Sequence, residues 1–191
     1  VVLTLPISSA AICAAVGISG GAVLAGVLDG SISMGVWNGL ALAGGAATVG
    51  CCCNMLGFAV ISYPDNGVGG LVAQGLGTSM LQVPNLMRKP VLWIPPVLTS
   101  AILGPVATCI FQLRNNGAAI SSGMGTAGLV GPIGIITGWS NMPEGYAVGA
   151  FDWLGMILVC FVLPVLLSWA IGKFMRKKGW IKEGDLKVDL G

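Results

Sequence analysis

Long, largely apolar segments constrain this chain more than any other feature of its sequence. Four such segments, at about 3–28, 36–63, 91–113 and 147–172, each contain enough residues to cross a bilayer, because the roughly 30 Å hydrocarbon layer requires about 20 residues of α-helix. Only 8% of the 191 residues are charged, whereas soluble domains carry roughly 25%. The sequence therefore predicts an all-α integral membrane protein with about four transmembrane helices.

A ten-residue motif occurs twice in the chain. GLGTSMLQVP at residues 75–84 returns as GMGTAGLVGP at 123–132, with Gly, Gly, Thr, Leu and Pro at matching positions. Both copies lie in apolar segments rich in Gly, Ser and Thr, at about 68–87 and 117–140. Glycines and a proline at these positions argue against a straight membrane-spanning helix. We interpret both segments as helix–turn–helix hairpins that enter the membrane and return on the same side.

The distribution of basic residues supports this interpretation. If both hairpins are re-entrant, Arg88 and Lys89 share a side with the basic C-terminus, and Arg114 lies on the other side. The positive-inside rule then places the C-terminus in the cytoplasm. The two hairpins enter from opposite faces as an inverted repeat, and such repeats place a solute site near the bilayer midplane, where the two tips meet.

The chain divides into a membrane transport domain, 1–172, and a basic cytoplasmic tail, 173–191. The charges of the tail predict a solvated segment. The chain begins VVLTLPISSAA, with neither a methionine nor a basic flank. We therefore expect it to be the C-terminal part of a longer protein, starting within a membrane segment.

Polar groups at the hairpin tips form the candidate binding site. Backbone N–H groups at the start of a helical arm attract anions and hydroxyl oxygens, and glycines at a tip allow positive φ and a close approach of the ligand. Two asparagines of the second apolar segment are further candidates to face this site, although hydrogen bonding between helices would also explain them. The candidate substrate-binding residues are Asn38, Asn54, Gly77, Thr78, Ser79, Gln82, Gly125 and Thr126.

The chemistry of this set is neutral. Hydroxyl and amide groups suit a polyol, a sugar or a small oxyanion, and no carboxylate lies at either tip to bind a cation. The alternative is that the glycines only pack and the hydroxyls bond within the hairpins. The chain has no histidine, its six cysteines form no Cys-x-x-Cys pair, and no lysine follows the glycines as a nucleotide loop requires. We therefore predict no catalytic residues, metal, cofactor or nucleic-acid partner.

Three stretches, LPISSAAI, AGGAATVGCCCNMLGFAVISYPDNGVGGLVAQGLGTSMLQVPNLMRKPVLWIPP and SGMGTAGLVGP, carry a resemblance. With them the chain resembles the membrane IIC component of bacterial sugar phosphotransferase systems, in the PTS EIIC type 2, PfoR-like regulator branch. The resemblance implies a homodimeric inner-membrane protein with an elevator-type transport domain and two opposed hairpins. It also implies a sugar-like substrate and a soluble IIB-type phosphoryl donor.

The resemblance favours a transporter that moves a sugar-like or other small polar solute by alternating access. Better-studied IIC proteins hold the sugar with a hairpin glutamate in a Gly-Ile-Thr-Glu-Pro stretch, whereas GIITG, residues 134–138, has none. Two alternatives therefore stay open. One is a membrane-embedded regulator or sensor that binds a solute without transporting it, and the other is a passive channel.

Overall fold

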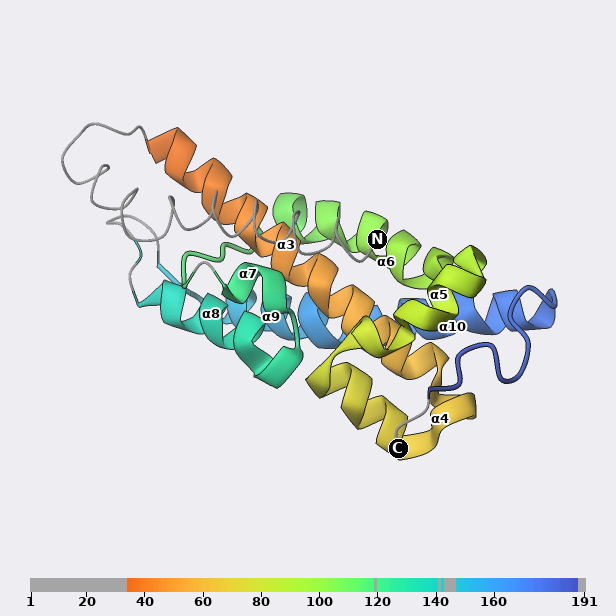
Figure 1. The fold of residues 1–191 in the computed structure, drawn as a ribbon. Helices are drawn as coiled ribbons and strands as arrows, with labels where there is room; N and C mark the ends of the chain where they lie inside the picture. Colours follow the sequence, from red (N-terminus) through yellow and green to blue (C-terminus); the bar gives the residue numbers. More distant parts are fainter. Residues whose placement is uncertain (1–33, 119, 141, 143–146, 189–191) are drawn as a thin grey trace.

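All regular structure in the described part of the chain is helical (Figure 1). The computed structural model describes residues 34–118, 120–140, 142 and 147–188. The apolar segment predicted at 3–28 lies outside these residues. The described residues form long helices and two short helix pairs, each interrupted by a break.

In the part of the chain that the structure describes, three helices are long and apolar enough to cross a membrane, and they correspond to the segments predicted at 36–63, 91–113 and 147–172. The first is α3, Met34–Ile61. The second runs over Pro90–Ile110 and contains α6, Ile94–Pro105. The third runs over Ala150–Lys177 and contains α9, Ala150–Ile157, and α10, Leu163–Lys177. The prediction of an integral membrane protein with these apolar helices is confirmed.

The third long helix adapts to an internal proline through a π-helical segment. Leu158–Val162 is π-helical and immediately precedes the turn that contains Pro164. A proline ring clashes with the carbonyl four residues earlier in a regular α-helix, and a π-bulge widens the turn at that point. A second π segment, Val106–Ile110, follows Pro105 instead of preceding it, so the same clash does not explain it.

Small residues bring α3, α6 and α10 close together. A Cβ on Gly57 would lie 2.9 Å from Ser168 Oγ and 3.1 Å from Pro96 Cβ, and one on Gly172 would lie 2.7 Å from Ile61 Cγ2. In lipid, helices associate through such close contacts rather than through the hydrophobic effect. The core between these helices is apolar and includes buried Cys52, Cys53 and Cys160.

The first broken pair corresponds to the segment predicted at 68–87. It begins with α4, Tyr63–Val72, and a π segment, Ala73–Gly77. The chain is extended at Thr78 (φ −154°, ψ 135°), and then a 3₁₀ turn, Ser79–Gln82, leads into α5, Val83–Arg88. The break therefore falls within the repeated motif, as its glycines and proline predict.

The second broken pair corresponds to the segment predicted at 117–140. Its first arm is short, α7, Ser121–Met124, and its second arm is α8, Val130–Trp139. Between them, Gly125, Gly128 and Leu129 all have positive φ. In Figure 1 this pair lies beside one part of α3, and α4 lies near the other end of that helix.

The end of the chain differs from the solvated tail that its charges predict. α10 continues through Lys177, and the following residues fold back onto the first broken pair. Ile181 and Leu186 are buried, with exposed fractions of 2% and 0%. These two apolar side chains contribute to a buried cluster, so the segment is packed against the helices and is not fully solvated.

Candidate functional site

The two copies of the motif contact each other directly. Thr126 Oγ1 donates a hydrogen bond to the backbone carbonyl of Gly75 at 2.6 Å, and Thr126 is fully buried. Helical hydrogen bonding is interrupted at the extended residue Thr78, whose N–H bonds back to Ala73 O. The carbonyl of Gly75 therefore lies at a helix end, where backbone groups need partners from elsewhere. The two motif copies therefore lie in contact, whereas their role as tips of re-entrant hairpins at a solute site stays a prediction.

Thr78 and Thr126 occupy matching positions in the motif but have different surroundings. The Thr78 side chain is exposed, and its Oγ1 accepts a hydrogen bond from Met80 N at 3.2 Å. It thus caps the 3₁₀ turn that follows the first break. Thr126 instead joins the second break to the first.

Gly125 allows the second break to lie against the backbone of α3. It has a φ of +55°, and a Cβ built on it would lie 2.7 Å from the carbonyl carbon of Cys51 and 2.8 Å from Cys52 N. Any larger residue would clash with α3. The next turn is closed by a hydrogen bond from Gly131 N to Gly125 O at 2.8 Å.

A cavity of about 550 Å³ lies between α3 and the two breaks. Both copies of the motif border it, and α3 and the start of the Pro90–Ile110 helix complete its wall. Its lining residues are Ala47, Gly50, Cys51, Asn54, Met55, Phe58, Thr78, Ser79, Met80, Val83, Leu86, Trp93, Val97, Ser122, Gly123, Met124 and Ala127. This volume is in the range of small-molecule binding sites.

The polar lining of the cavity consists of neutral groups. Asn54 Nδ2 donates to Gly50 O within α3 at 2.9 Å, which leaves the amide oxygen as an acceptor for a ligand. Ser122 lines the cavity, and its buried hydroxyl has no hydrogen-bond partner in the described part of the chain. Cys51 Sγ lies 3.4 Å from Gly123 O. None of the described lining residues is charged, so the arrangement suits a neutral, hydroxyl-bearing solute.

The structure brings only some of the predicted site residues to this cavity. Asn54, Thr78 and Ser79 line it, and Gly125 and Thr126 lie at the contacts that hold the second break against α3 and the first break. Gly77 is exposed beside the first break, with no atom within 4 Å of a Cβ built on it.

The other two predicted residues are engaged elsewhere. Gln82 is fully buried, and its Nε2 donates to Gln74 Oε1 at 3.0 Å and to Leu186 O at 2.9 Å. Asn38 lies near the start of α3, where its Oδ1 accepts a hydrogen bond from Arg114 Nε at 2.6 Å.

Aromatic side chains in the cavity wall were missed by the sequence analysis. Phe58 of α3 and Trp93 both line the cavity, with ring centroids 6.4 Å apart and planes at 81°. Their sequence contexts are uniformly apolar, so no periodicity distinguishes a residue that faces a cavity from one that faces lipid. Ser122 was not among the predicted site residues, although its position directly before the second motif placed it close to the predicted tip.

Comparison with known proteins decides the family. A family model described as "Phosphotransferase system, EIIC" matches residues 1–188. The chain belongs to this family. No curated protein and no solved structure matches it.

Membership in the EIIC family, together with the apolar helices, establishes a membrane transporter of the phosphotransferase type. It implies a sugar-like substrate and a soluble IIB partner. The PfoR-like branch stays a prediction.

Proposed function

We propose that this EIIC protein moves a sugar-like or other small polar solute across the membrane by alternating access, and that the cavity between the two breaks binds the solute. The observation that supports the site is that both motif copies border the cavity and are joined by the Thr126–Gly75 hydrogen bond. Because the cavity lies between two breaks that are hydrogen-bonded to each other, movement of either break changes the shape of the cavity.

The predicted residues then have different tasks. Asn54, Thr78 and Ser79 hydrogen-bond to the solute, because they line the cavity. Gly125 and Thr126 hold the second break in place. In this proposal Gly77, Gln82 and Asn38 act indirectly: Gly77 through the shape of the first break, Gln82 through its buried amide bonds, and Asn38 through Arg114.

The proposal includes the arrangement in the membrane. The two broken pairs are re-entrant hairpins that enter from opposite faces of the bacterial inner membrane, within an elevator-type domain. The C-terminus is cytoplasmic and the protein is a homodimer. The orientation of the pairs and of the C-terminus is supported by the placement of the basic residues and by the positions of the two pairs along α3 (Figure 1).

A regulator or sensor is the second candidate function. The described cavity lining contains no carboxylate that would act as a base on a sugar hydroxyl. A site without such a group binds a solute but relies on another group for phosphoryl transfer from a IIB partner. This feature of the lining favours the regulator; nothing in the described structure favours the passive channel.

Binding to purified protein tests the site. Melting temperatures are measured in detergent with a panel of hexoses, hexitols and sugar acids, and the compound that raises the melting temperature is then titrated by calorimetry. Loss of a neutral hydrogen bond costs about 0.5–1.5 kcal/mol, and stranding a buried partner costs about 1–3 kcal/mol. Thr78→Val and Ser79→Ala should therefore weaken binding by roughly 2- to 150-fold.

Thr108→Val is the matched control, since Thr108 is outside the cavity and its hydroxyl bonds to helix carbonyls at Gly104 and Pro105. If the cavity variants stay monodisperse and bind like the unchanged protein, the proposed site is wrong. Uptake of the identified compound into proteoliposomes then separates the functions: a transporter accumulates or exchanges it, whereas a regulator binds it without uptake.

A further inference from the structure

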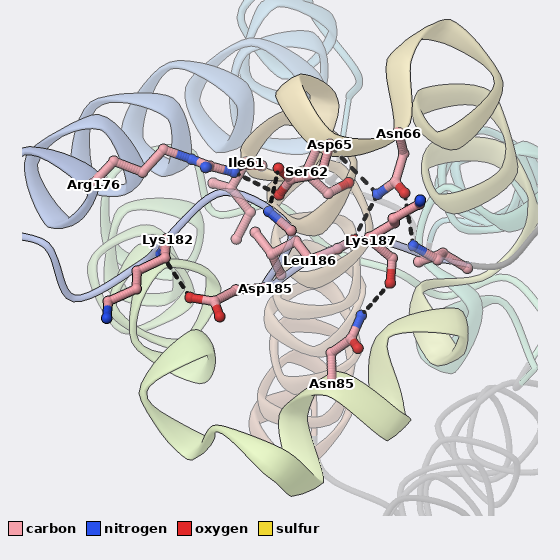
Figure 2. Close-up of polar contacts among 12 residues, drawn as sticks. Ile61, Ser62, Asp65, Asn66, Asn85, Arg176, Lys182, Asp185, Leu186 and Lys187 are labelled. Atoms are coloured by element: carbon pink, nitrogen blue, oxygen red, sulfur yellow. Dashed lines mark hydrogen bonds and ion pairs between the residues drawn. The ribbon is translucent and has the colours of Figure 1, made fainter.

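Residues 181–188, here named the C-terminal strap, are fastened to the first broken pair by side-chain amides (Figure 2). Asn66 Nδ2 donates to Leu186 O at 2.7 Å, and Gln82 Nε2 donates to the same carbonyl at 2.9 Å. Asn85 Nδ2 donates to Lys187 O at 2.8 Å, and Val188 N donates to Asn66 Oδ1 at 2.7 Å. Three side chains spread over both arms of the pair therefore bind one short stretch of backbone.

Two carboxylates, those of Asp185 and Asp65, fix the strap at two further points. Lys89 Nζ lies 2.5 Å from Asp185 Oδ2. The Asp65 carboxylate accepts hydrogen bonds from Gly184 N at 3.0 Å and from Arg176 Nη2 at 2.8 Å. Only 4% of the Asp65 side chain is exposed. Figure 2 shows Arg176 also reaching the end of α3, where it donates to Ile61 O at 3.0 Å.

A buried chain of amides leads from the strap toward the first break. Gln82, bonded to the strap, donates to Gln74 Oε1 at 3.0 Å, and Gln74 Nε2 donates to Ser62 Oγ at 2.9 Å. Gln74 and Gln82 are both fully buried. Gln74 directly precedes Gly75, whose carbonyl accepts the bond from Thr126. Because buried amides are costly to leave unpaired, displacement of the strap disturbs the geometry of the break.

The strap also shares an apolar wall with the cavity. Ile181 and Leu186 are buried in one cluster with Phe58 and Leu86, and Trp93 packs against that cluster. Phe58, Leu86 and Trp93 are at the same time cavity-lining residues. One side of this wall faces the strap and the other faces the cavity.

We propose that the C-terminal strap positions the first broken pair, so that releasing the strap opens the cavity wall. Gln82, Asn85 and Asp185 are then positioning residues for the cavity, although none of them lines it. The inference rests on the proposed function only for the identity of the cavity as the solute site.

Alkylation of Cys51 by N-ethylmaleimide measures the opening without any solute, so its outcome is independent of whether the proposed solute binds. Cys51 is half-buried and lines the cavity. The whole chain is used with Cys13 and exposed Cys109 replaced by serine, and labelling is followed by intact mass. A further Cys51→Ser variant identifies the signal that belongs to Cys51.

Asp185→Lys should raise the labelling rate about threefold or more, because it places a positive charge against Lys89 and shifts the local opening equilibrium. Asn85→Ala removes one hydrogen bond to the strap, so it should raise the labelling rate of Cys51 by a smaller factor. This variant tests the proposal if Asp185→Lys fails to fold. Glu183→Lys is the matched control: the same change of charge on an exposed strap residue should leave the rate unchanged.

Charge exchange distinguishes positioning from general loss of stability. Lys89→Asp combined with Asp185→Lys should return the labelling rate toward that of the unchanged protein, because the ion pair is restored in reverse. The proposal is overturned if folded Asp185→Lys and Asn85→Ala proteins label like the parent. It is also overturned if Glu183→Lys raises the rate as much as Asp185→Lys, or if the charge exchange gives no recovery.

Discussion

Gly125 and Gly77 occupy matching positions in the two motif copies, but only Gly125 needs to be a glycine. A Cβ on Gly125 would lie 2.7 Å from the Cys51 backbone at a φ of +55°, whereas Gly77 has no positive φ and no atom within 4 Å of a built Cβ. Overpacking typically costs about 1–3 kcal/mol, and left-handed backbone adds to this for a non-glycine residue. We therefore predict that Gly125→Ala lowers the melting temperature in detergent clearly and that Gly77→Ala changes it little. Equal effects of the two substitutions would contradict this.

Asp185 gives a prediction about pH. Partial desolvation raises the pKa of this carboxyl, but hydrogen bonds from Lys89 and from the Lys182 N–H, together with their charges, lower it below its ordinary value of 3.8. The ionised form is therefore favoured in the folded protein, and its stabilisation is complete above pH 3.8 and lost as the pH falls through the lower folded pKa. Asp185→Asn should melt below the parent at neutral pH, and this difference should close in acid. A difference that is constant with pH would show that the charge is not responsible.

Which polar residues line the cavity could be predicted only in part from the sequence. The motif correctly indicated Thr78 and Ser79 as residues near a break, and the structure places both in the cavity wall. It gave no sign that Thr126 would turn toward Gly75 O, because that bond joins segments 51 residues apart and depends on long-range packing. Phe58 and Trp93 were beyond sequence reasoning for a different reason: a uniformly apolar helix carries no signal for its cavity-facing side.

At the scale of elements, the long helices and the two breaks followed from simple rules. Apolar length predicted the spans, and Gly and Pro within an apolar segment predicted the breaks. The C-terminal segment departed from its expected solvation because Asp185 pairs with Lys89 while Ile181 and Leu186 enter the core. The overall charge of such a segment hides the effect of single residues, whereas two apolar side chains in the right places are enough to pack it against the helices.

The orientation of the broken pairs is tested by labelling single cysteines. Arg88→Cys at the end of α5 and Ser140→Cys after α8 are both exposed positions, introduced into a chain whose accessible cysteines are replaced by serine. If the hairpins are re-entrant from opposite faces, an impermeant maleimide should reach Arg88→Cys from the cytoplasm and Ser140→Cys from outside. The comparison uses intact cells and inside-out vesicles. Labelling of both sites from one side would contradict the inverted arrangement.

For the molecule as a whole, the described structure is held together around α3, which contacts α6, α10 and both broken pairs. The cavity lies where the two motif copies meet against this helix, and the strap covers the opposite side of one cavity wall. Local changes at α3, at the breaks or in the strap therefore converge on the same cavity. The family and the apolar helices were accessible from the sequence, but this convergence depends on long-range packing that no local pattern encodes.

The outer surface of the described helices leads to the last prediction, which concerns assembly. Large apolar side chains on α9 and α10, including Phe151, Leu154, Leu166 and Trp169, are each more than half exposed. In a membrane such a surface meets either lipid or another subunit. We expect a homodimer, since the exposed apolar surface of the described helices offers an area on which a second copy of the chain would pack. Native mass spectrometry and light scattering of the whole chain in a mild detergent should give the mass of two chains at several protein concentrations. Observation of the monomer mass alone, unchanged when native lipid is added back, would count against the dimer.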